Sequence, residues 1–426
     1  MGIVLVLAIF VIFLLVSIPL AFSLGMASVV GILLQGKVPL IIVAQKAFSG
    51  IDSFLLLSIP LFILAGMLMD QAGISLSLVN LAQSLVGFFR GGLALVVIFS
   101  EMLFSGVSGS VTADTAAIGS ILVPPMVKAG YGRERSTAIL SAACGMGILV
   151  PPCIQMIVYG GLTGVSIGAL FIAGFLPAAI MALALMIQVH IQARRLKLPT
   201  MGRPSLRLLG KSLVQSIPAA VMGIIIFGGI LGGIFTPTEA AVVAVVYGFI
   251  VGGILYRRIS LRSMLSMVIS TARITGTIML LVVTASLFAW FLTTERVPQV
   301  IAEFLLGLPG GVYIFLFSVN VIFLFIGSVL EGIPALIMMV PILLPAAQKL
   351  GIDPLHLGII LIANLGVGFF LPPIGLGLNV ACTVGGTTID RVTRPLLPYL
   401  AVMFAVVLVI SYMPSLVLWI PRAFGL

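Results

Sequence analysis

Charged residues are scarce in this chain of 426 residues. Only 8% are Asp, Glu, Lys or Arg, whereas 61% are hydrophobic; an ordinary soluble domain carries about 25% charged residues. This shortage excludes a soluble globular fold. Apolar stretches that approach or reach the roughly 20 residues of a bilayer span recur along the chain: 2–16, 53–69, 216–235, 240–255, 275–292, 312–326 and 399–420. Short alternating strand segments are absent, so we predict an all-α polytopic membrane protein.

Side chains that commonly carry catalysis are also rare. The only histidines are His190 and His356, and no HExxH, GxSxG or P-loop motif is present. The three cysteines, Cys144, Cys153 and Cys382, lack CxxC or metal spacing and are predicted to be small buried residues. We therefore expect neither enzyme activity nor a covalent cofactor.

Acidic residues are outnumbered, with 11 Asp and Glu against 21 Lys and Arg, which gives a net charge of +10. Cytoplasmic loops of membrane proteins carry Lys and Arg, so the excess indicates membrane orientation and not nucleic-acid binding. No acid lies between Glu134 and Glu239. We predict a basic cytoplasmic linker over residues 193–212. Because no basic segment precedes the first apolar run, a cleaved signal peptide is not expected.

Two parts of the chain repeat at an offset of 221 residues without a gap. The most telling pairs are two proline breaks inside apolar segments, Pro124 with Pro345 and Pro151-Pro152 with Pro372-Pro373. The offset also pairs Gly106 with Gly327, Gly145 with Gly366, Gly147 with Gly368 and Pro177 with Pro398. Matched broken helices in two halves of a membrane protein indicate a transporter and mark its binding site.

The repeat divides the chain into halves, 1–192 and 213–426. Each half is predicted to begin with scaffold helices and to continue with a re-entrant hairpin and a Pro-Pro-broken transmembrane helix. The hairpins are expected at about 105–127 and 327–348, and the broken helices at about 137–163 and 357–383. Such repeats are related by either inverted or parallel topology, and the count of spans leaves both open.

Each Pro-Pro pair removes two helical donors. Pro151 and Pro152 lack the N–H groups that would bond the carbonyls of Gly147 and Ile148, and Pro372 and Pro373 free those of Gly368 and Phe369 by the same spacing. Unsatisfied carbonyls survive at membrane depth only where protein, water or an ion satisfies them. With nearby hydroxyls they form an oxygen cage that suits Na⁺.

The most polar segment inside an apolar region runs from Ser105 to Asp114. An ionisable group in a span indicates function. A carboxylate repels an anionic substrate, so we expect Asp114 to offset the charge of a bound cation or to hold the hairpin tip. The predicted substrate and tip region comprises Ser105, Asp114, Gln155, Asn364 and Asn379.

Other polar positions have structural interpretations. Thr236, Pro237 and Glu239 have the spacing of a capping box, in which Thr236 is the N-cap. Three arginines, Arg296, Arg391 and Arg394, are expected to reach the membrane interface from helix ends.

On these residues the chain resembles the large membrane subunit of tripartite ATP-independent periplasmic (TRAP) transporters. The similarity covers essentially the whole chain and rests on four stretches: 105–114, 148–159 with its Pro-Pro, 233–241 with Phe-Thr-Pro-Thr-Glu-Ala, and 371–375.

The resemblance implies an elevator transporter of inverted repeats in the bacterial inner membrane, coupled to Na⁺. It also implies two partners, a small four-helix membrane subunit and a periplasmic binding protein that delivers an organic acid such as a C4-dicarboxylate, a keto acid or a sialic-acid-like sugar acid.

Carried over by motif, the implied Na⁺-binding positions fall in two groups. They are Ser108, Ser110, Gly147, Leu149 and Pro152 for the first site, and Gly327, Ser328, Gly368 and Leu371 for the second. The chain departs from the family pattern at Cys153, where Ser is usual, and at Glu331–Pro334 in the second hairpin.

Two alternatives remain open from the sequence. One is a self-contained divalent-anion/Na⁺ symporter of related architecture, which needs no binding protein. The other is a membrane scaffold or intramembrane enzyme, although a scaffold has no physical reason to keep two matched broken helices.

Overall fold

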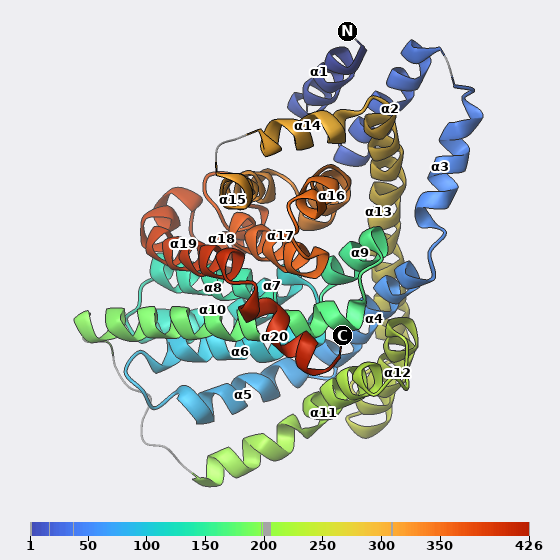
Figure 1. The fold of residues 1–426 in the computed structure, drawn as a ribbon. Helices are drawn as coiled ribbons and strands as arrows, with labels where there is room; N and C mark the ends of the chain where they lie inside the picture. Colours follow the sequence, from blue (N-terminus) through green and yellow to red (C-terminus); the bar gives the residue numbers. More distant parts are fainter. Residues whose placement is uncertain are drawn as a thin grey trace.

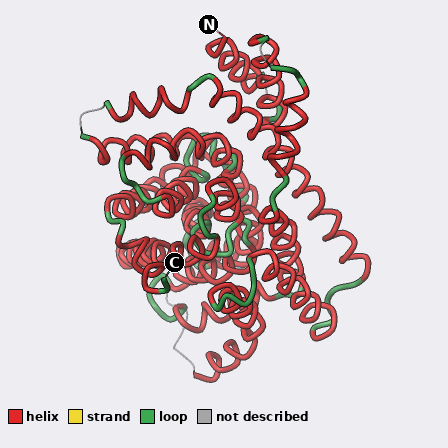
Figure 2. Tube along the Cα trace, turned by 45° about the vertical axis from the view of Figure 1, so that its right-hand side comes forward, coloured by secondary structure: helices red, strands yellow, loops and turns green. Residues whose placement is uncertain are grey.

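Helices make up all the regular structure of the described residues. The computed structural model describes residues 2–16, 18–36, 38–196, 198, 206–307 and 310–425, and no strand occurs in these ranges. Eight of the helices found there are long and apolar enough to cross a membrane. The predicted fold class, an all-α polytopic membrane protein, is therefore confirmed. Figure 2 shows these helices joined by loops.

The first 86 residues form a run of helices ahead of the first repeated unit. α2 begins directly after Pro19 and ends before Gly36, whose φ of 60° is left-handed and is accessible to glycine without steric cost. The elements are α1 (Gly2–Leu15), α2 (Leu20–Gln35), α3 (Ile41–Ile51), the 3₁₀ turn η1 (Phe54–Leu57), α4 (Ser58–Gln71) and α5 (Ile74–Val86).

The first repeated unit contains a hairpin, a broken helix and a long closing helix. The hairpin turns at Gly109-Ser110, and its first arm begins at residue 92, earlier than the hairpin boundary of about 105 expected from the sequence. The broken helix is interrupted between Gly147 and Ile154. The elements are α6 (Gly92–Ser108), α7 (Val111–Lys128), α8 (Arg133–Gly147), α9 (Ile154–Thr163) and α10 (Ile167–Arg195).

A second run of helices follows the basic linker. Residues 197 and 199–205 of that predicted linker lie outside the described residues. The elements are α11 (Leu206–Leu231), α12 (Pro237–Phe249), its π-helical continuation η2 (Ile250–Leu255), α13 (Leu261–Thr294) and α14 (Val297–Leu306).

The second repeated unit has the same order of elements as the first. Its hairpin turns at Leu330-Glu331, and its broken helix is interrupted between Gly368 and Leu376. In both units the Pro-Pro peptide bond is cis. The elements are α15 (Gly311–Val329), α16 (Gly332–Lys349), α17 (Pro354–Gly368), α18 (Leu376–Gly385) and α19 (Ile389–Tyr412), followed by α20 (Ser415–Ala423).

The helices outside the two units pack mainly against each other. α13, the long helix that runs vertically in Figure 1, contacts α2, α3 and α4, while α12 packs on α4 and α11 on α5. The α12–α4 contact is close because Gly248 has no side chain: a Cβ built there would lie 3.1 Å from Cβ of Leu68. We call these helices, α1–α5 and α11–α14, the scaffold.

α12 starts with the capping box that its sequence spacing predicts. Thr236 Oγ1 accepts from the Glu239 N–H at 3.3 Å, and the Glu239 carboxylate accepts from the Thr236 N–H at 2.7 Å. Pro237 occupies the first helical position, where its missing N–H is not needed. The Glu239 carboxylate is thus hydrogen-bonded to the backbone at the start of its own helix.

The two repeated units pack against each other reciprocally. α7 of the first unit contacts α18 of the second, and the equivalent α16 of the second contacts α9 of the first. The broken helices α8 and α17 cross at two glycines paired by the 221-residue offset: a Cβ on Gly366 would lie 2.2 Å from the Gly145 carbonyl oxygen, and one on Gly145 would lie 2.8 Å from that of Gly366. Only glycine allows the two backbones to approach this closely.

Candidate functional site at the first hairpin tip

The tip of the first hairpin lies between the first helix break and the scaffold. On one side, Cβ atoms on Gly106 and Gly109 would lie 3.3 and 3.1 Å from the carbonyl oxygens of Pro151 and Pro152. On the other side, a Cβ on Gly66 of α4 would lie 2.7 Å from the Ser108 carbonyl oxygen. Three glycines therefore bring the tip into backbone contact with both neighbours.

Hydrogen bonds tie the tip and the break together. Ser105 Oγ donates to the Gly147 carbonyl at 2.8 Å, which joins α6 to the end of α8. Ser108 Oγ donates to Asp114 Oδ1 and accepts from the Ser110 N–H at 3.2 Å. The hydroxyls of Ser110 and Thr112 lie 3.3 Å apart. These residues, singled out by the sequence, do come together in space.

Asp114 is completely buried, and only one of its two carboxylate oxygens accepts a hydrogen bond. Its exposed fraction is 0%, and its Oδ2 has no hydrogen-bond partner among the described residues. An unpaired carboxylate oxygen in an apolar interior costs several kcal/mol, so Oδ2 is available to an additional partner. A hard cation is a partner of the required charge.

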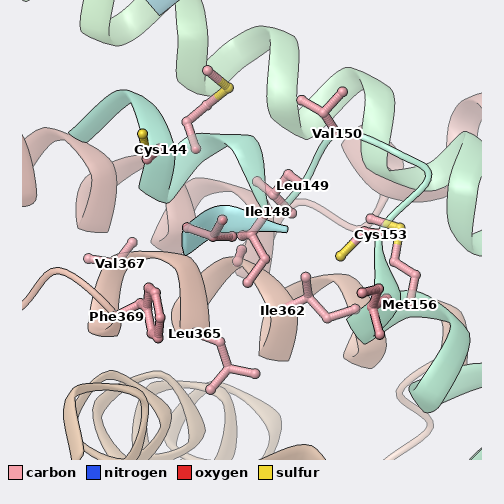
Figure 3. Packing of buried hydrophobic residues seen from close by; sticks show 14 of the residues in the cluster. Cys144, Ile148, Leu149, Val150, Cys153, Met156, Ile362, Leu365, Val367 and Phe369 are labelled. Atoms are coloured by element: carbon pink, nitrogen blue, oxygen red, sulfur yellow. The ribbon is translucent and has the colours of Figure 1, made fainter. Parts of the chain in front are cut away.

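Two of the carbonyls that the prolines were expected to leave without a partner, those of Gly147 and Gly368, accept hydrogen bonds in the structure. Gly147 O accepts from the Val150 N–H at 2.9 Å as well as from Ser105, and Gly368 O accepts from the Leu371 N–H at 2.9 Å. The reason is that the last turn of each half-helix tightens to bonds between residues three apart, which recovers part of what the prolines remove. Figure 3 shows the first break, from Ile148 to Cys153, with the apolar side chains around it.

The second tip is built differently from the first. Gly327 packs against the second break, since a Cβ on Gly368 would lie 3.0 Å from its Cα. Ser328 Oγ donates to Phe325 O at 2.7 Å, inside its own helix. Glu331 is exposed and is the N-cap of α16 without a side-chain cap bond. The described residues thus place no buried unpaired carboxylate at this tip.

The remaining predicted site residues separate into two groups. Gln155 of α9 reaches across to the second hairpin, where a Cβ on Gly332 would lie 3.4 Å from its side chain, and it accepts from Cys153 Sγ at 2.9 Å. Asn364 instead donates to Asn320 Oδ1 at 2.6 Å in a buried network, and Asn379 donates to the carbonyl of Ile374 at 3.1 Å. These two asparagines hold helices and a turn together.

A cavity of about 340 Å³ opens at the first tip. Two helix N-termini face it: Ser110, Thr112 and Ala113 from the start of α7, and Ile154 from the start of α9. Neither terminus has a side-chain cap bond, and the partial positive charge of a helix N-terminus favours an anion there. The other lining residues come from α6 and the scaffold: Ile63, Gly66, Met67, Asp70, Phe104, Ser108 and Ile274.

A larger cavity of about 510 Å³ lies on another side of the first hairpin, between α5, α6, α10 and α11. Its lining is apolar except for Ser216 and backbone groups near Pro151. Such a lining suits hydrocarbon and gives an anion no partner. We therefore place the candidate site at the smaller cavity.

Sequence reasoning missed two acidic residues near this site. Asp70 lines the cavity from α4 and accepts a hydrogen bond from Ser75. Glu101 lies on α6 with an exposed fraction of 0%, and its place in an otherwise apolar run, four residues before Ser105 on the same helical face, is the signal that would have found it.

Comparisons with known proteins agree across nearly the whole chain. Residues 7–416 match the family model described as the tripartite ATP-independent periplasmic transporter, DctM component. The C4-dicarboxylate TRAP transporter large permease protein DctM of Pseudomonas aeruginosa is 38% identical over 95% of both chains. The sialic acid TRAP transporter large permease protein SiaM of Vibrio cholerae is 35% identical, also over 95% of both.

Among solved structures, the YdaH transporter of Alcanivorax borkumensis is similar in fold. The TM-score is 0.62 at 15% identity, and the match covers 96% of this chain and 98% of that one.

Proposed function

Because this chain belongs to the DctM family of TRAP transporter large permeases, we propose that it imports an organic acid, coupled to Na⁺, through the cavity at the first hairpin tip. The substrate class under this proposal is a small carboxylate: a C4-dicarboxylate, a keto acid or a sugar acid. Relatives named for a C4-dicarboxylate and for sialic acid support that range.

The observation that carries the proposal is the charge pattern of the cavity. Two uncapped helix N-termini offer N–H donors to an anion, yet none of the lining residues is basic and Asp70 is acidic. A carboxylate substrate entering this cavity needs further positive charge nearby. Bound Na⁺ supplies that charge, so substrate binding depends on the ion.

The residues around the first tip fit a Na⁺ ion. Asp114 presents an unpartnered oxygen in a fully buried position, and Ser108, Ser110 and the backbone of the Pro-Pro break present hydroxyl and carbonyl oxygens. Oxygen donors with one net negative charge suit a monovalent hard cation. At the second break, Gly327, Gly368 and Leu371 offer backbone oxygens alone, with Ser328 engaged within its helix.

An elevator mechanism accounts for the way the units and the scaffold meet. The reciprocal packing of α7 on α18 and α16 on α9, with the Gly145–Gly366 crossing, makes the two units one body. This reciprocity is what a pseudo-two-fold relation between the repeats produces. The first tip contacts the scaffold at Gly66, where a Cβ would lie 2.7 Å from the Ser108 carbonyl oxygen, and the units also pack on the scaffold where α6 contacts α4 and α5 and where α16 contacts α13 and α14. Movement of the joined units past α4 would carry the cavity across the membrane.

Two partners follow from the proposal. A small membrane subunit packs on the scaffold, and a periplasmic binding protein delivers the substrate to the permease in the bacterial inner membrane. The competing candidate, a self-contained divalent-anion/Na⁺ symporter, differs in needing neither partner.

Uptake into proteoliposomes tests the proposal. The chain is reconstituted with and without the small subunit, and labelled organic acids are offered with and without candidate binding proteins under a Na⁺ gradient, a K⁺ gradient or a pH gradient. Uptake that requires Na⁺ and both partners supports the proposal. Equal uptake under a proton gradient alone refutes Na⁺ coupling, and robust uptake by the chain alone identifies the self-contained symporter.

A further inference from the structure

The larger cavity, of about 510 Å³, lies between the repeated units and the scaffold. Helices α6 and α10 and the first helix break line it from the first unit, and α5 and α11 line it from the scaffold; all four helices are labelled in Figure 1. Apart from Ser216, every lining side chain is apolar. A lining of this kind in a membrane protein accepts hydrocarbon, because a polar occupant would find almost no hydrogen-bond partners.

The cavity is long and narrow. Its lining on α11 runs from Leu213 to Phe227, which is about 21 Å at the helical rise per residue. Spread over that length, 510 Å³ gives a mean cross-section of about 24 Å². An α-helix with its side chains is about 10–12 Å wide and needs at least about 80 Å². A helix of another protein is therefore too wide for this cavity, whereas a single extended hydrocarbon chain is not.

Basic side chains stand at one end of the cavity. Lys211 lies two residues before Leu213, the first residue of α11 in the cavity lining, and Arg207 lies one turn earlier on the same helical face. Both basic side chains are exposed. Helices α5, α10 and α11 carry no acidic residue, so this positive charge is not neutralised from the helices that line the cavity beside it.

The end of α5 lies at the same end of the cavity. Ser84 Oγ and Ser212 Oγ lie 2.8 Å apart, and Ser216 Oγ donates to the Ser77 carbonyl at 3.2 Å. These two contacts show that α5 and α11 run antiparallel. The chain that leaves α5 therefore carries Arg90, which is exposed, toward the start of α11.

The end of α10 adds a further positive charge. A Cβ on Gly91 would lie 2.5 Å from Cβ of Ala193, so the start of α6 packs directly on the end of α10. Arg90 precedes Gly91, and Arg194 follows Ala193 with its side chain exposed. Glu101, the acidic residue of α6, is completely buried and does not line the cavity. Hydrocarbon space with positive charge at one end is complementary to an amphiphile with an anionic head.

We propose that this cavity binds one acyl chain of an anionic phospholipid from the surrounding membrane, with the headgroup on the basic residues at the start of α11 and the end of α10. Basic pockets between transmembrane helices on the cytoplasmic side bind anionic headgroups. The excess of Lys and Arg in this part of the chain is what a cytoplasmic position requires. The inference uses neither the proposed substrate nor the proposed Na⁺ coupling.

The bound chain would lie along the surface where the first unit meets the scaffold. At Gly223 of α11 a Cβ would meet nothing within 4 Å, so no side chain fills this space. A flexible hydrocarbon chain can fill it and change shape when α6 and α10 move relative to α5 and α11. This consequence rests on the proposed elevator movement, whereas lipid binding itself does not.

Native mass spectrometry of the purified, delipidated permease measures binding without Na⁺ or substrate. Three probes are titrated: dioleoyl-phosphatidylglycerol, which is anionic; dioleoyl-phosphatidylcholine, which has the same chains and no net charge; and dioctanoyl-phosphatidylglycerol, which has the same headgroup on short chains. We expect one tightly bound dioleoyl-phosphatidylglycerol per permease and binding weaker by about fivefold or more for each of the others. Equal affinity for the two headgroups, or for the two chain lengths, overturns the proposal.

Two substitutions locate the lipid. Gly223→Phe places a ring in the open space of the cavity and is expected to abolish tight binding, while Lys211→Gln is expected to weaken it by about fivefold. The matched controls are Gly276→Phe on α13, where a Cβ also meets nothing within 4 Å, and Lys349→Gln at the exposed end of α16. Both controls are expected to bind as the wild type does. Tight binding retained by Gly223→Phe shows that the chain lies elsewhere and leaves the proposed function standing.

Discussion

Replacing Gly66 of α4 with alanine tests whether the first hairpin tip docks on the scaffold during transport. The added Cβ would lie 2.7 Å from Ser108 O, 3.1 Å from Ser108 Cα and 3.3 Å from Ser108 C. All three are backbone atoms, so no side-chain rotation removes the clash. Gly66→Ala thus perturbs one backbone contact between the first unit and the scaffold.

The size of the effect follows from the cost of overpacking. Forcing a methyl group into a close-packed contact costs about 1–3 kcal/mol, and each 1.4 kcal/mol is a factor of ten in an equilibrium. The described state should therefore lose population to states in which the tip has left α4, by roughly fivefold to a hundredfold. Uptake should fall accordingly, while the protein still folds.

Distances between spin labels measure this redistribution directly. Labels on Asn80→Cys in the scaffold and Ser120→Cys on α7 occupy exposed positions, and the three native cysteines are buried. Gly66→Ala should shift the distance distribution away from the docked state. The control is Gly223→Ala on α11, where a Cβ meets nothing within 4 Å. An unchanged distribution together with normal uptake would refute the docking contact at Gly66.

Three further substitutions separate ion binding from stability. Asp114→Asn keeps the size of the side chain but removes the charge; folding and assembly should persist while uptake at limiting Na⁺ falls, and normal uptake there would show that Asp114 is only a tolerated polar residue. Gly366→Ala places a Cβ 2.2 Å from Gly145 O and should lower the free energy of unfolding by about 1–3 kcal/mol; an unchanged thermal transition would contradict the crossing. Thr236→Ala removes an N-cap and should cost about 1 kcal/mol with Na⁺ dependence retained, whereas a changed half-maximal Na⁺ concentration would show that the cap also serves transport.

The comparison of sequence with structure is most instructive at Asn364 and Glu239. The sequence predicts Asn364 in the tip region because it flanks a break, and in the structure its side chain donates to Asn320. Glu239 was predicted to cap its own helix, and it does. A cap depends on residues three positions apart, whereas the partner of Asn364 comes from another helix, which no local spacing specifies.

The sequence by itself determined the features that depend on chain order and backbone chemistry. Low charge and long apolar runs require a membrane protein, the 221-residue offset marks the paired units, and Pro-Pro pairs interrupt a helix wherever they stand. Only the tertiary structure decided which groups meet. It placed Gly145 against Gly366 and Gly66 against Ser108, and it buried Glu101 beside the first break, because contacts between helices distant in the chain are set by how whole surfaces pack and not by the spacing within either one.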